Sequence, residues 1–444
     1  MSASAKLGQD DRPLLLVPRR VPKAWGEELW LNSTWGESPA GVAGGGTLAQ
    51  VLRRQPRLLG AWSRRLFGDG LPVFAKILRT DFPPLAHIGF NSLVRPQEFL
   101  GWLCREVALL SALRRSLRAP DERAFRRFTK TYEAWATERA LDGWQAAPER
   151  DRKFAAALGR FSKIERRELL QLCEDLRRNR QRIVGVLNLV DLRRESGNLL
   201  MIKAGLIHAL FGLSLQFHPQ DATLVALQDF ILSARGRGRA AQKLRLARQR
   251  QEGAFAPKSE VWMPLPFERQ LRLAEVQQSS DCTFSVADFF TPFIWERGAR
   301  FRKGHPALGT SDASFRRLLG GLDFSVTSLA SLRCRPQPSE PGPQAKSCRL
   351  WRLLDRPAVW PFFTVQVLDL AGTATAAARW VAPLAPAFQH VIVLSGKARI
   401  EYPGGTCRIS AKAPAFVPAR PAADWAISAG EPASLLLVSV PGPR

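Results

Sequence analysis

Two segments of this chain carry side chains that could bind a metal ion from a strand. In Gly197–Gly212, a strand, a tight turn at Gly205 and a returning strand would direct His208 into the mouth of a barrel. Glu260 lies in PKSEVWMPL on a short apolar strand, where it faces either a barrel mouth or, by simple alternation, solvent. A zinc site with nitrogen and oxygen ligands needs three or four side chains, and the chain has only five histidines. Most of these histidines would have to converge for such a site to form.

Several basic residues could bind an anionic group. Lys76 interrupts an apolar strand, and a lysine in that position needs either a partner or an open cleft. Arg297 and Arg300, in WERGARFRKGH, could bind a phosphate as a fork, although a solvated loop is an equal alternative. Lys258 is a similar but weaker candidate. We therefore expect Lys76 and Glu260 in catalysis, and Lys258, Arg297 and Arg300 in substrate binding.

The composition is that of a globular protein with a large excess of positive charge. Hydrophobic residues make up 45% of the 444 residues, which excludes a disordered or fibrous class, and the formal net charge is +26. No uninterrupted apolar run of about 18 residues occurs, so we predict no membrane span. The start of the chain lacks a signal-peptide pattern and the six cysteines form no CxxC pair. We expect reduced thiols and a cytoplasmic protein.

The basic residues are spread over the whole length of the chain rather than gathered in one patch. The densest run, ARGRGRAAQKLRLARQRQ at Ala234–Gln251, is either a solvated loop or a phosphate-binding arm. No helix-turn-helix signature and no basic strand with interleaved aromatic residues accompanies it. We therefore do not expect nucleic acid as a partner.

Hydrophobic periodicity divides the chain into strand-rich and helical parts. Strand-like segments occur in 1–95 and again in 193–332, whereas 96–192 repeats apolar residues at spacings of three and four, as helices do. The stretch 333–348 is rich in proline and polar residues and predicts a linker or loop, and 349–444 alternates again. We predict a mainly β protein with an α insertion, in which one β domain is interrupted by helices and followed by a second.

A series of segments, in this order, resembles the type I phosphomannose isomerase (mannose-6-phosphate isomerase) family of the cupin superfamily. AWGEELWLNSTWG, TLAQVLRRQPRLLG and LPVFAKILRTDFPPLAH resemble its opening segment, a helix, and the strand that leads to its first metal-binding motif. The helical insert, the spacing of Gly205 and His208, which resembles the second cupin motif, and QQSSDCTF follow in the family's order. The resemblance implies two cupin-type jelly rolls with an inserted helical domain.

The same resemblance implies one zinc ion per chain and the interconversion of mannose 6-phosphate and fructose 6-phosphate. The metal would hold the substrate's carbonyl and hydroxyl oxygens while a proton moves between neighbouring carbons. The family's ligands are a Gln-x-His pair, a glutamate in a Lys-Pro-Glu context and the histidine of the second cupin motif. His208 matches that last histidine, and in PPLAHIGFN only His87 remains of the pair.

Two positions of the ligand set stay open. The glutamate is Glu260, although the family's order would place it nearer Glu98 in RPQEF. The segment LSLQFHPQD contains a Gln-x-His sequence, Gln216 and His218, but it follows the helical insert, whereas the family's pair precedes it. We expect His87 to stand in for the pair, with Gln216 or His218 as a fourth ligand. The predicted metal ligands are His87, His208, Glu260 and His218.

Two functions follow from these patterns. The first is a metal-dependent aldose–ketose isomerase that acts on mannose 6-phosphate. The alternative is a non-catalytic cupin that has lost its metal and binds a sugar phosphate or a partner. The missing Gln-x-His pair and Lys203, which stands where the family has proline, favour this alternative. We expect His390, in the C-terminal part, to be structural.

Overall fold

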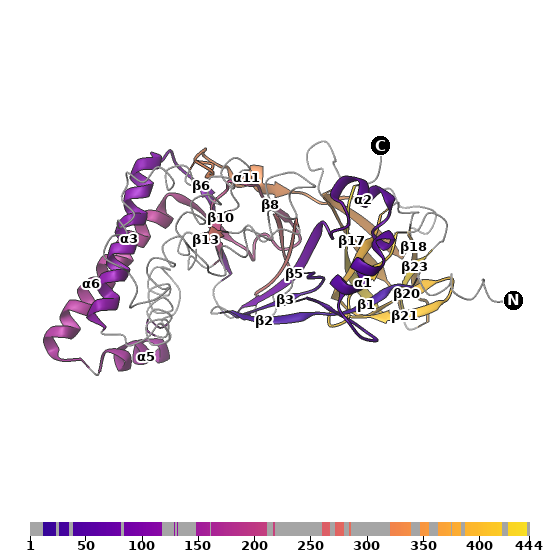
Figure 1. The fold of residues 1–444 in the computed structure, drawn as a ribbon, viewed down its shortest axis with the longest axis horizontal. Helices are drawn as coiled ribbons and strands as arrows, with labels where there is room; N and C mark the ends of the chain where they lie inside the picture. The colour runs from indigo at the N-terminus through magenta and orange to yellow at the C-terminus, as the bar shows by residue number, and fades with distance from the viewer. Residues whose placement is uncertain are drawn as a thin grey trace.

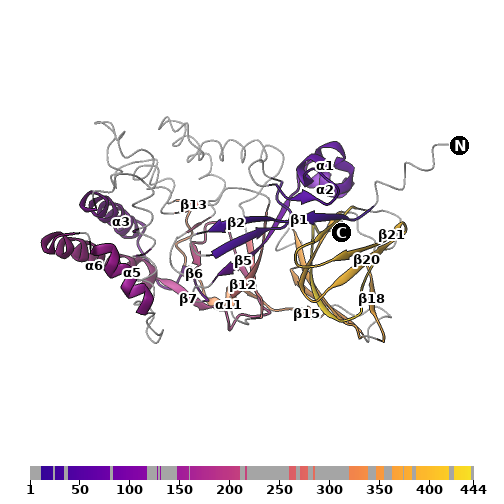
Figure 2. The ribbon, with the colours of Figure 1, turned by 90° about the horizontal axis from the view of Figure 1, so that it is seen from below.

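The computed structural model is elongated, with helices at one end, a β domain in the middle and a second β domain at the other end (Figures 1 and 2). The strands of the two β domains pair antiparallel, so the expectation of a mainly β protein with a helical insertion is confirmed. No helix that the structure describes is both long and apolar enough to cross a membrane. The structure describes residues 12–23, 26–34, 39–80, 84–117, 128, 131, 148–159, 161–210, 216–217, 260–266, 271–278, 284–285, 320–338, 347–354, 363–373, 375–382, 387–419 and 425–441.

A seven-stranded sheet forms the centre of the molecule. One of its faces carries Val73, Val261 and Val276, which pack in a core shared with the C-terminal domain. The other face carries Leu78 and Leu273, which pack toward a smaller sheet. In sheet order the seven strands are β14 (Arg333–Cys334), β8 (Leu199–Ile202), β11 (Glu260–Pro264), β12 (Leu271–Gln278), β5 (Val73–Thr80), β3 (Gly26–Trp30) and β2 (Arg19–Lys23).

A five-stranded sheet lies against the second face of the seven-stranded sheet. Ala86, Ile88 and Val190 from this sheet join Leu78 and Leu273 in one core, so the two sheets enclose a common interior. In sheet order its strands are β13 (Phe284–Ser285), β10 (Gln216–Phe217), β9 (His208–Leu210), β6 (Leu85–Phe90) and β7 (Leu187–Asp191). The short helix α11 (Leu329–Leu332) leads into β14.

The helical end consists of α3 (Pro96–Ser116), α5 (Pro148–Leu158) and α6 (Lys163–Gly185). Phe99, Leu113, Leu169 and Leu176 share a core at the α3–α6 contact. Ser162 begins α6 with a capping box, in which its hydroxyl accepts from the Glu165 backbone N–H. The helix ends at Gly185, earlier than the range 96–192 predicts, because the following residues pair with β6 as β7.

The C-terminal domain is a β sandwich of an eight-stranded and a four-stranded sheet. Strands β1 and β4 come from the N-terminal part of the chain and join the larger sheet, where Leu14 pairs with Phe416. The segment 1–95, which was predicted to belong to the first β domain, is therefore divided between the two β domains. The larger sheet has the order β15 (Gln337–Pro338), β16 (Cys348–Leu354), β17 (Thr364–Ala371), β24 (Pro432–Ser439), β19 (Gln389–Ser395), β22 (Ala415–Val417), β1 (Leu14–Val17), β4 (Gly41–Val42). The smaller has the order β18 (Ala378–Val381), β23 (Ala426–Ala429), β20 (Ala398–Tyr402), β21 (Gly405–Ile409).

Two short helices cover the edge of this domain (Figure 1). Helix α1 (Leu48–Arg54) begins at Thr47 with a capping box and ends before Pro56, which opens the 3-10 helix η1 (Pro56–Leu59). Helix α2 (Ala61–Phe67) follows directly. The structural role expected for His390 is confirmed: it is buried on β19, where its Nε2 lies 2.8 Å from Asn32 Nδ2.

Candidate functional site

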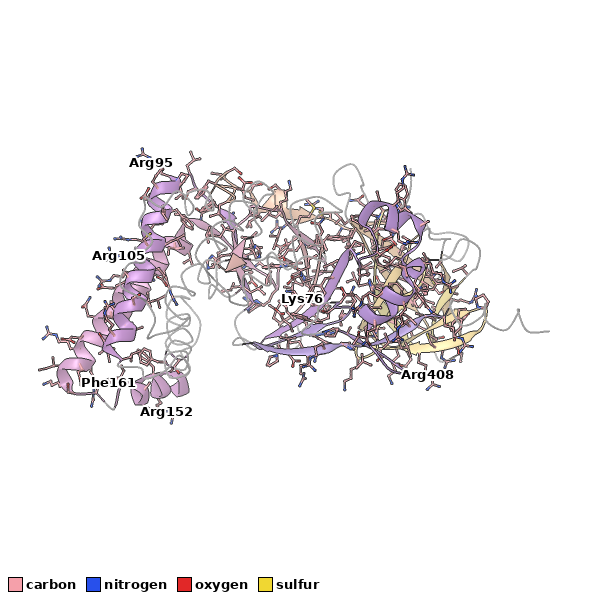
Figure 3. All side chains as sticks on the ribbon, viewed as in Figure 1. Lys76, Arg95, Arg105, Arg152, Phe161 and Arg408 are labelled. Atoms are coloured by element: carbon pink, nitrogen blue, oxygen red, sulfur yellow. The ribbon has the colours of Figure 1, made fainter. Side chains whose placement is uncertain are left out.

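Charged and aromatic side chains form a row across the interior face of the seven-stranded sheet. Lys76 pairs directly with Trp30 on one side and with Glu275 on the other, and Glu275 pairs with Trp262. Directly paired residues of antiparallel strands lie on the same face of the sheet. In Figure 3 the labelled Lys76 lies in the middle of the molecule, between the helical end and the C-terminal sandwich. Because Trp262 shares the core between the two sheets with Leu78 and Leu273, the row faces the interior that the two sheets enclose.

Lys76 is held by carboxylates from both neighbouring strands. Its Nζ lies 2.9 Å from Glu275 Oε1 and 3.6 Å from Glu28 Oε1. Burial by itself lowers the pKa of the Lys76 ammonium, but the charges of Glu275, Glu28 and Glu260 outweigh burial and raise the pKa above its ordinary value. Lys76 therefore stays protonated. The partner that sequence reasoning required is an internal carboxylate pair.

Glu275 is buried among groups of the same charge. Burial and the negative charges of Glu260 and Glu28 raise the pKa of its carboxyl to about 8, although the Lys76 ammonium acts in the opposite direction. Glu28 is fixed from the other side, because the Trp30 indole N–H donates to its Oε2 at 2.7 Å. Glu275 therefore keeps its proton to a higher pH than an ordinary glutamate does.

His208 lies at the corner where the chain passes from one sheet to the other. Strand β8 belongs to the seven-stranded sheet, whereas β9, which begins at His208, belongs to the five-stranded sheet. Gly205 makes the turn between them with a φ of 82°, which a residue with a side chain rarely adopts. The predicted strand, turn and returning strand are present, and His208 is buried directly opposite Ile88.

His208 meets Glu260 across this interior. Its Nδ1 lies 3.0 Å from the backbone oxygen of Leu206, so Nδ1 carries the hydrogen that is donated there. In the neutral ring Nε2 is then an acceptor, and it lies 3.3 Å from Oε1 of the buried Glu260. Two acceptors at this distance repel each other unless a proton or a metal ion lies between them. Glu260 is buried, so its carboxylate does not face solvent, the alternative that simple alternation left open.

The residues present fit two ligands of one zinc ion. Zinc bonds to histidine nitrogen and carboxylate oxygen are about 2.0–2.2 Å long, which places two tetrahedral ligands about 3.3 Å apart. A carbonyl that binds the second ring nitrogen, as that of Leu206 binds His208, is the usual support of a metal-bound histidine. Within the ranges that the structure describes, however, no three His, Cys, Asp or Glu side chains gather to hold a metal.

His87 does not converge with His208. On β6, Ile88 is the residue directly opposite His208, and its neighbour His87 pairs with Ala209 and with the exposed Leu189. Because side chains alternate along a strand, His87 lies on the outer face of the five-stranded sheet. Burial there lowers the pKa of His87 to about 4. This geometry does not fit the predicted role of His87 as a ligand beside His208.

Strand β10 brings the other Gln-x-His segment to His208. Gln216 is paired directly with His208 in the β9–β10 ladder, and it lies two residues before His218. Glu98, the competing glutamate, is exposed in the first turn of α3, where an acidic residue offsets the helix dipole. The predicted residues His218, Lys258, Arg297 and Arg300 and the basic run Ala234–Gln251 lie outside the described residues.

Sequence reasoning missed two members of the cluster, Glu28 and Glu275. The signal was available for Glu275, because Leu273, Glu275 and Gln277 alternate with Ala274 and Val276 in a strand that is buried on both faces. A carboxylate in such a strand requires a partner, and Lys76 in the equally apolar β5 is the matching cation. Glu28 carries no comparable signal, because its strand is short and includes other charged residues.

The comparisons with known proteins give similarities in fold only. No family model matches the chain, and no curated protein sequence matches it. A protein of Archaeoglobus fulgidus assigned provisionally as a mannosephosphate isomerase is 10% identical, with a TM-score of 0.47 over 98% of this chain and 100% of the other. Mannose 6-phosphate isomerase of Salmonella typhimurium with fructose 6-phosphate and zinc is 11% identical, with a TM-score of 0.42 over 97% and 99%. Its apo form gives 11% and 0.43 over the same shares.

Proposed function

We propose that this chain is a metal-dependent aldose–ketose isomerase that interconverts mannose 6-phosphate and fructose 6-phosphate. The observation that carries the proposal is the contact of His208 Nε2 with Glu260 Oε1, which lie 3.3 Å apart in a buried interior. A second support is the adjacent carboxyl of Glu275, whose pKa is raised to about 8. The ordered series of family-like segments in the sequence supplies the choice of substrate.

The proposed ligands are His208 and Glu260, completed by the segment that contains Gln216 and His218. The direct pairing of Gln216 with His208 supports this choice over His87. The charges support it as well, because the three carboxyl groups of Glu28, Glu260 and Glu275 outnumber the single ammonium of Lys76, and a bound cation would offset that excess. A zinc ion bound there would supply Lewis-acid polarisation of a carbonyl group.

The chain's own residues divide the remaining work. Isomerisation moves a proton between neighbouring carbons, and a group with a pKa near neutrality is suited to take it and return it. Among the described residues Glu275 has that property. Lys76 keeps its proton and acts as a fixed positive charge that stabilises a developing negative charge nearby. Lys258, Arg297 and Arg300 are proposed to bind the phosphate group.

The test is turnover of mannose 6-phosphate by zinc-loaded protein, followed directly by proton NMR so that no coupling enzyme contributes. Wild type should form fructose 6-phosphate, whereas His208→Ala and Glu260→Gln should lose both the metal and turnover. His87→Ala is the matched control, because it removes a half-buried histidine of the same sheet from the opposite face. Turnover in wild type no greater than in His208→Ala would refute the proposal.

A non-catalytic sugar-phosphate binding protein is the second candidate. It is favoured by the interior positions of β6, where Ala86 and Ile88 stand nearest to His208 and offer no metal ligand. In this case a proton, in place of a metal ion, lies between His208 Nε2 and Glu260 Oε1 and forms a hydrogen bond. Metal analysis separates the two functions, because a preparation that cannot be loaded with zinc, yet binds fructose 6-phosphate, supports the second.

A further inference from the structure

The interior row contains two indoles, Trp30 and Trp262, and the N–H of Trp262 has no hydrogen-bond partner in the described part of the chain. Trp262 lies on β11 two residues after Glu260, so both side chains are on the same face of the sheet. Its ring meets the His208 ring edge to face, with centroids 5.4 Å apart. Trp262 is 2% exposed, and its Nε1 has no hydrogen-bond partner among the residues that the structure describes.

Three other indoles in the described part of the chain have a hydrogen-bond partner. The N–H of Trp30 donates to Glu28 Oε2 at 2.7 Å, that of Trp62 to the Pro441 backbone oxygen at 2.6 Å, and that of Trp351 to Asp369 Oδ2 at 2.8 Å. A buried N–H without an acceptor is destabilising, and a buried tryptophan usually finds a partner. The unpaired N–H of Trp262 lies beside the proposed metal ligands His208 and Glu260. A molecule bound there would supply hydrogen-bond acceptors.

We propose that the Trp262 indole N–H donates a hydrogen bond to an oxygen of the sugar phosphate bound at His208 and Glu260. The donor is held ready because Trp262 is fixed by its neighbours Leu78, Leu273 and Ile202 in one core. The inference rests on the proposed function, since it needs a sugar phosphate in this interior. It makes Trp262 a substrate-contacting residue, which favours ligands with an oxygen at that position over those that lack one.

The experiment compares Trp262→Phe with Trp351→Phe, which removes an indole N–H that has a partner. Two quantities are measured: the Tm of the metal-free protein, and the Kd for fructose 6-phosphate of the zinc-loaded protein by calorimetry. Trp262→Phe should weaken binding about three- to tenfold, the range of one hydrogen bond, and should lower Tm because the smaller ring leaves a cavity in the core. Benzothienylalanine at the same position leaves no such cavity, so it should leave Tm unchanged or raise it. Trp351→Phe should lower Tm and leave the Kd unchanged.

The result that would overturn the inference is a Trp262→Phe variant that binds fructose 6-phosphate as tightly as wild type. Benzothienylalanine at position 262, which replaces only the N–H by sulfur, repeats the comparison at constant shape and serves if the phenylalanine variant does not fold. If wild type itself binds no sugar phosphate, the proposed function fails with the inference. If wild type binds and both Trp262 variants bind equally well, the inference alone fails.

Discussion

Replacement of Lys76 by methionine removes the cation from the interior row. The ammonium lies 2.9 Å from Glu275 Oε1 and 3.6 Å from Glu28 Oε1, and the Lys76 side chain is 14% exposed. At an effective dielectric constant of about 20, the closer contact alone is worth about 6 kcal/mol, from which the desolvation of both ions is subtracted. Removal of one partner from a buried pair costs about 3–5 kcal/mol. We expect Lys76→Met to lower the free energy of unfolding by this amount at pH 8.

A double-mutant cycle isolates the pair. Glu275→Gln removes the carboxylate charge, so the double variant Lys76→Met/Glu275→Gln should be more stable than Lys76→Met alone by about 1–3 kcal/mol. The assay is urea unfolding followed by circular dichroism, with the m-value checked for two-state behaviour. The control pair is Arg64 and Asp69, which are 2.7 Å apart on the surface and 41% and 64% exposed. Loss of Arg64 should cost less than about 1 kcal/mol.

The outcome that would refute the reasoning is a Lys76→Met variant that loses no more stability than the Arg64 control. A double variant whose loss is the sum of the two single losses would refute it as well. Either result would mean that the Lys76 ammonium reaches solvent and does not hold the carboxylates.

The free energy of unfolding measured at high pH gives a second check on Lys76. Because its folded pKa is raised above 10.5, the stability it contributes is present below that pH and is lost above it.

Three further predictions follow from the buried titratable groups. Glu275 has a folded pKa raised from 4.5 to about 8, so wild type should lose stability as the pH rises through this window, and Glu275→Gln should flatten that slope in urea unfolding. Burial lowers the pKa of His390 to about 3, so stability should fall by about 4–5 kcal/mol as the pH falls from 6.5 toward 3, and His390→Leu should lose this dependence; an unchanged acid limb would contradict it. His87→Ala should keep its zinc in elemental analysis and His218→Ala should lose it; the reverse result would restore His87 as a ligand.

The sequence predicts the site in part, and the differences have physical causes. The turn at Gly205 and the strand around Glu260 are local patterns, and both are present. The face on which His87 lies could not be predicted, because a strand's periodicity does not say which face points inward, and Gly89, at a φ of 65°, interrupts the register of β6 after it. The pairing of Gln216 with His208 could not be predicted, since it joins strands through the tertiary arrangement of two sheets.

The predicted domain limits differ from the structure where strands pair over long distances in the sequence. Leu14–Val17 is an ordinary apolar strand in sequence, yet it pairs with β22 of the C-terminal sheet. Long-range pairing of this kind leaves no local signal. The range 96–192 predicted for the helical insert includes Leu187–Asp191, which is apolar enough to continue a helix but pairs with β6 as strand β7.

The measurement that tests the central claim most directly is an anomalous difference map, recorded at the zinc absorption edge, from crystals of the full chain grown with zinc. The account predicts one strong peak per chain, within bonding distance of both His208 Nε2 and a carboxylate oxygen of Glu260. A map without a peak between these two side chains, or with the zinc bound at His87 on the outer face of the sheet, would contradict it.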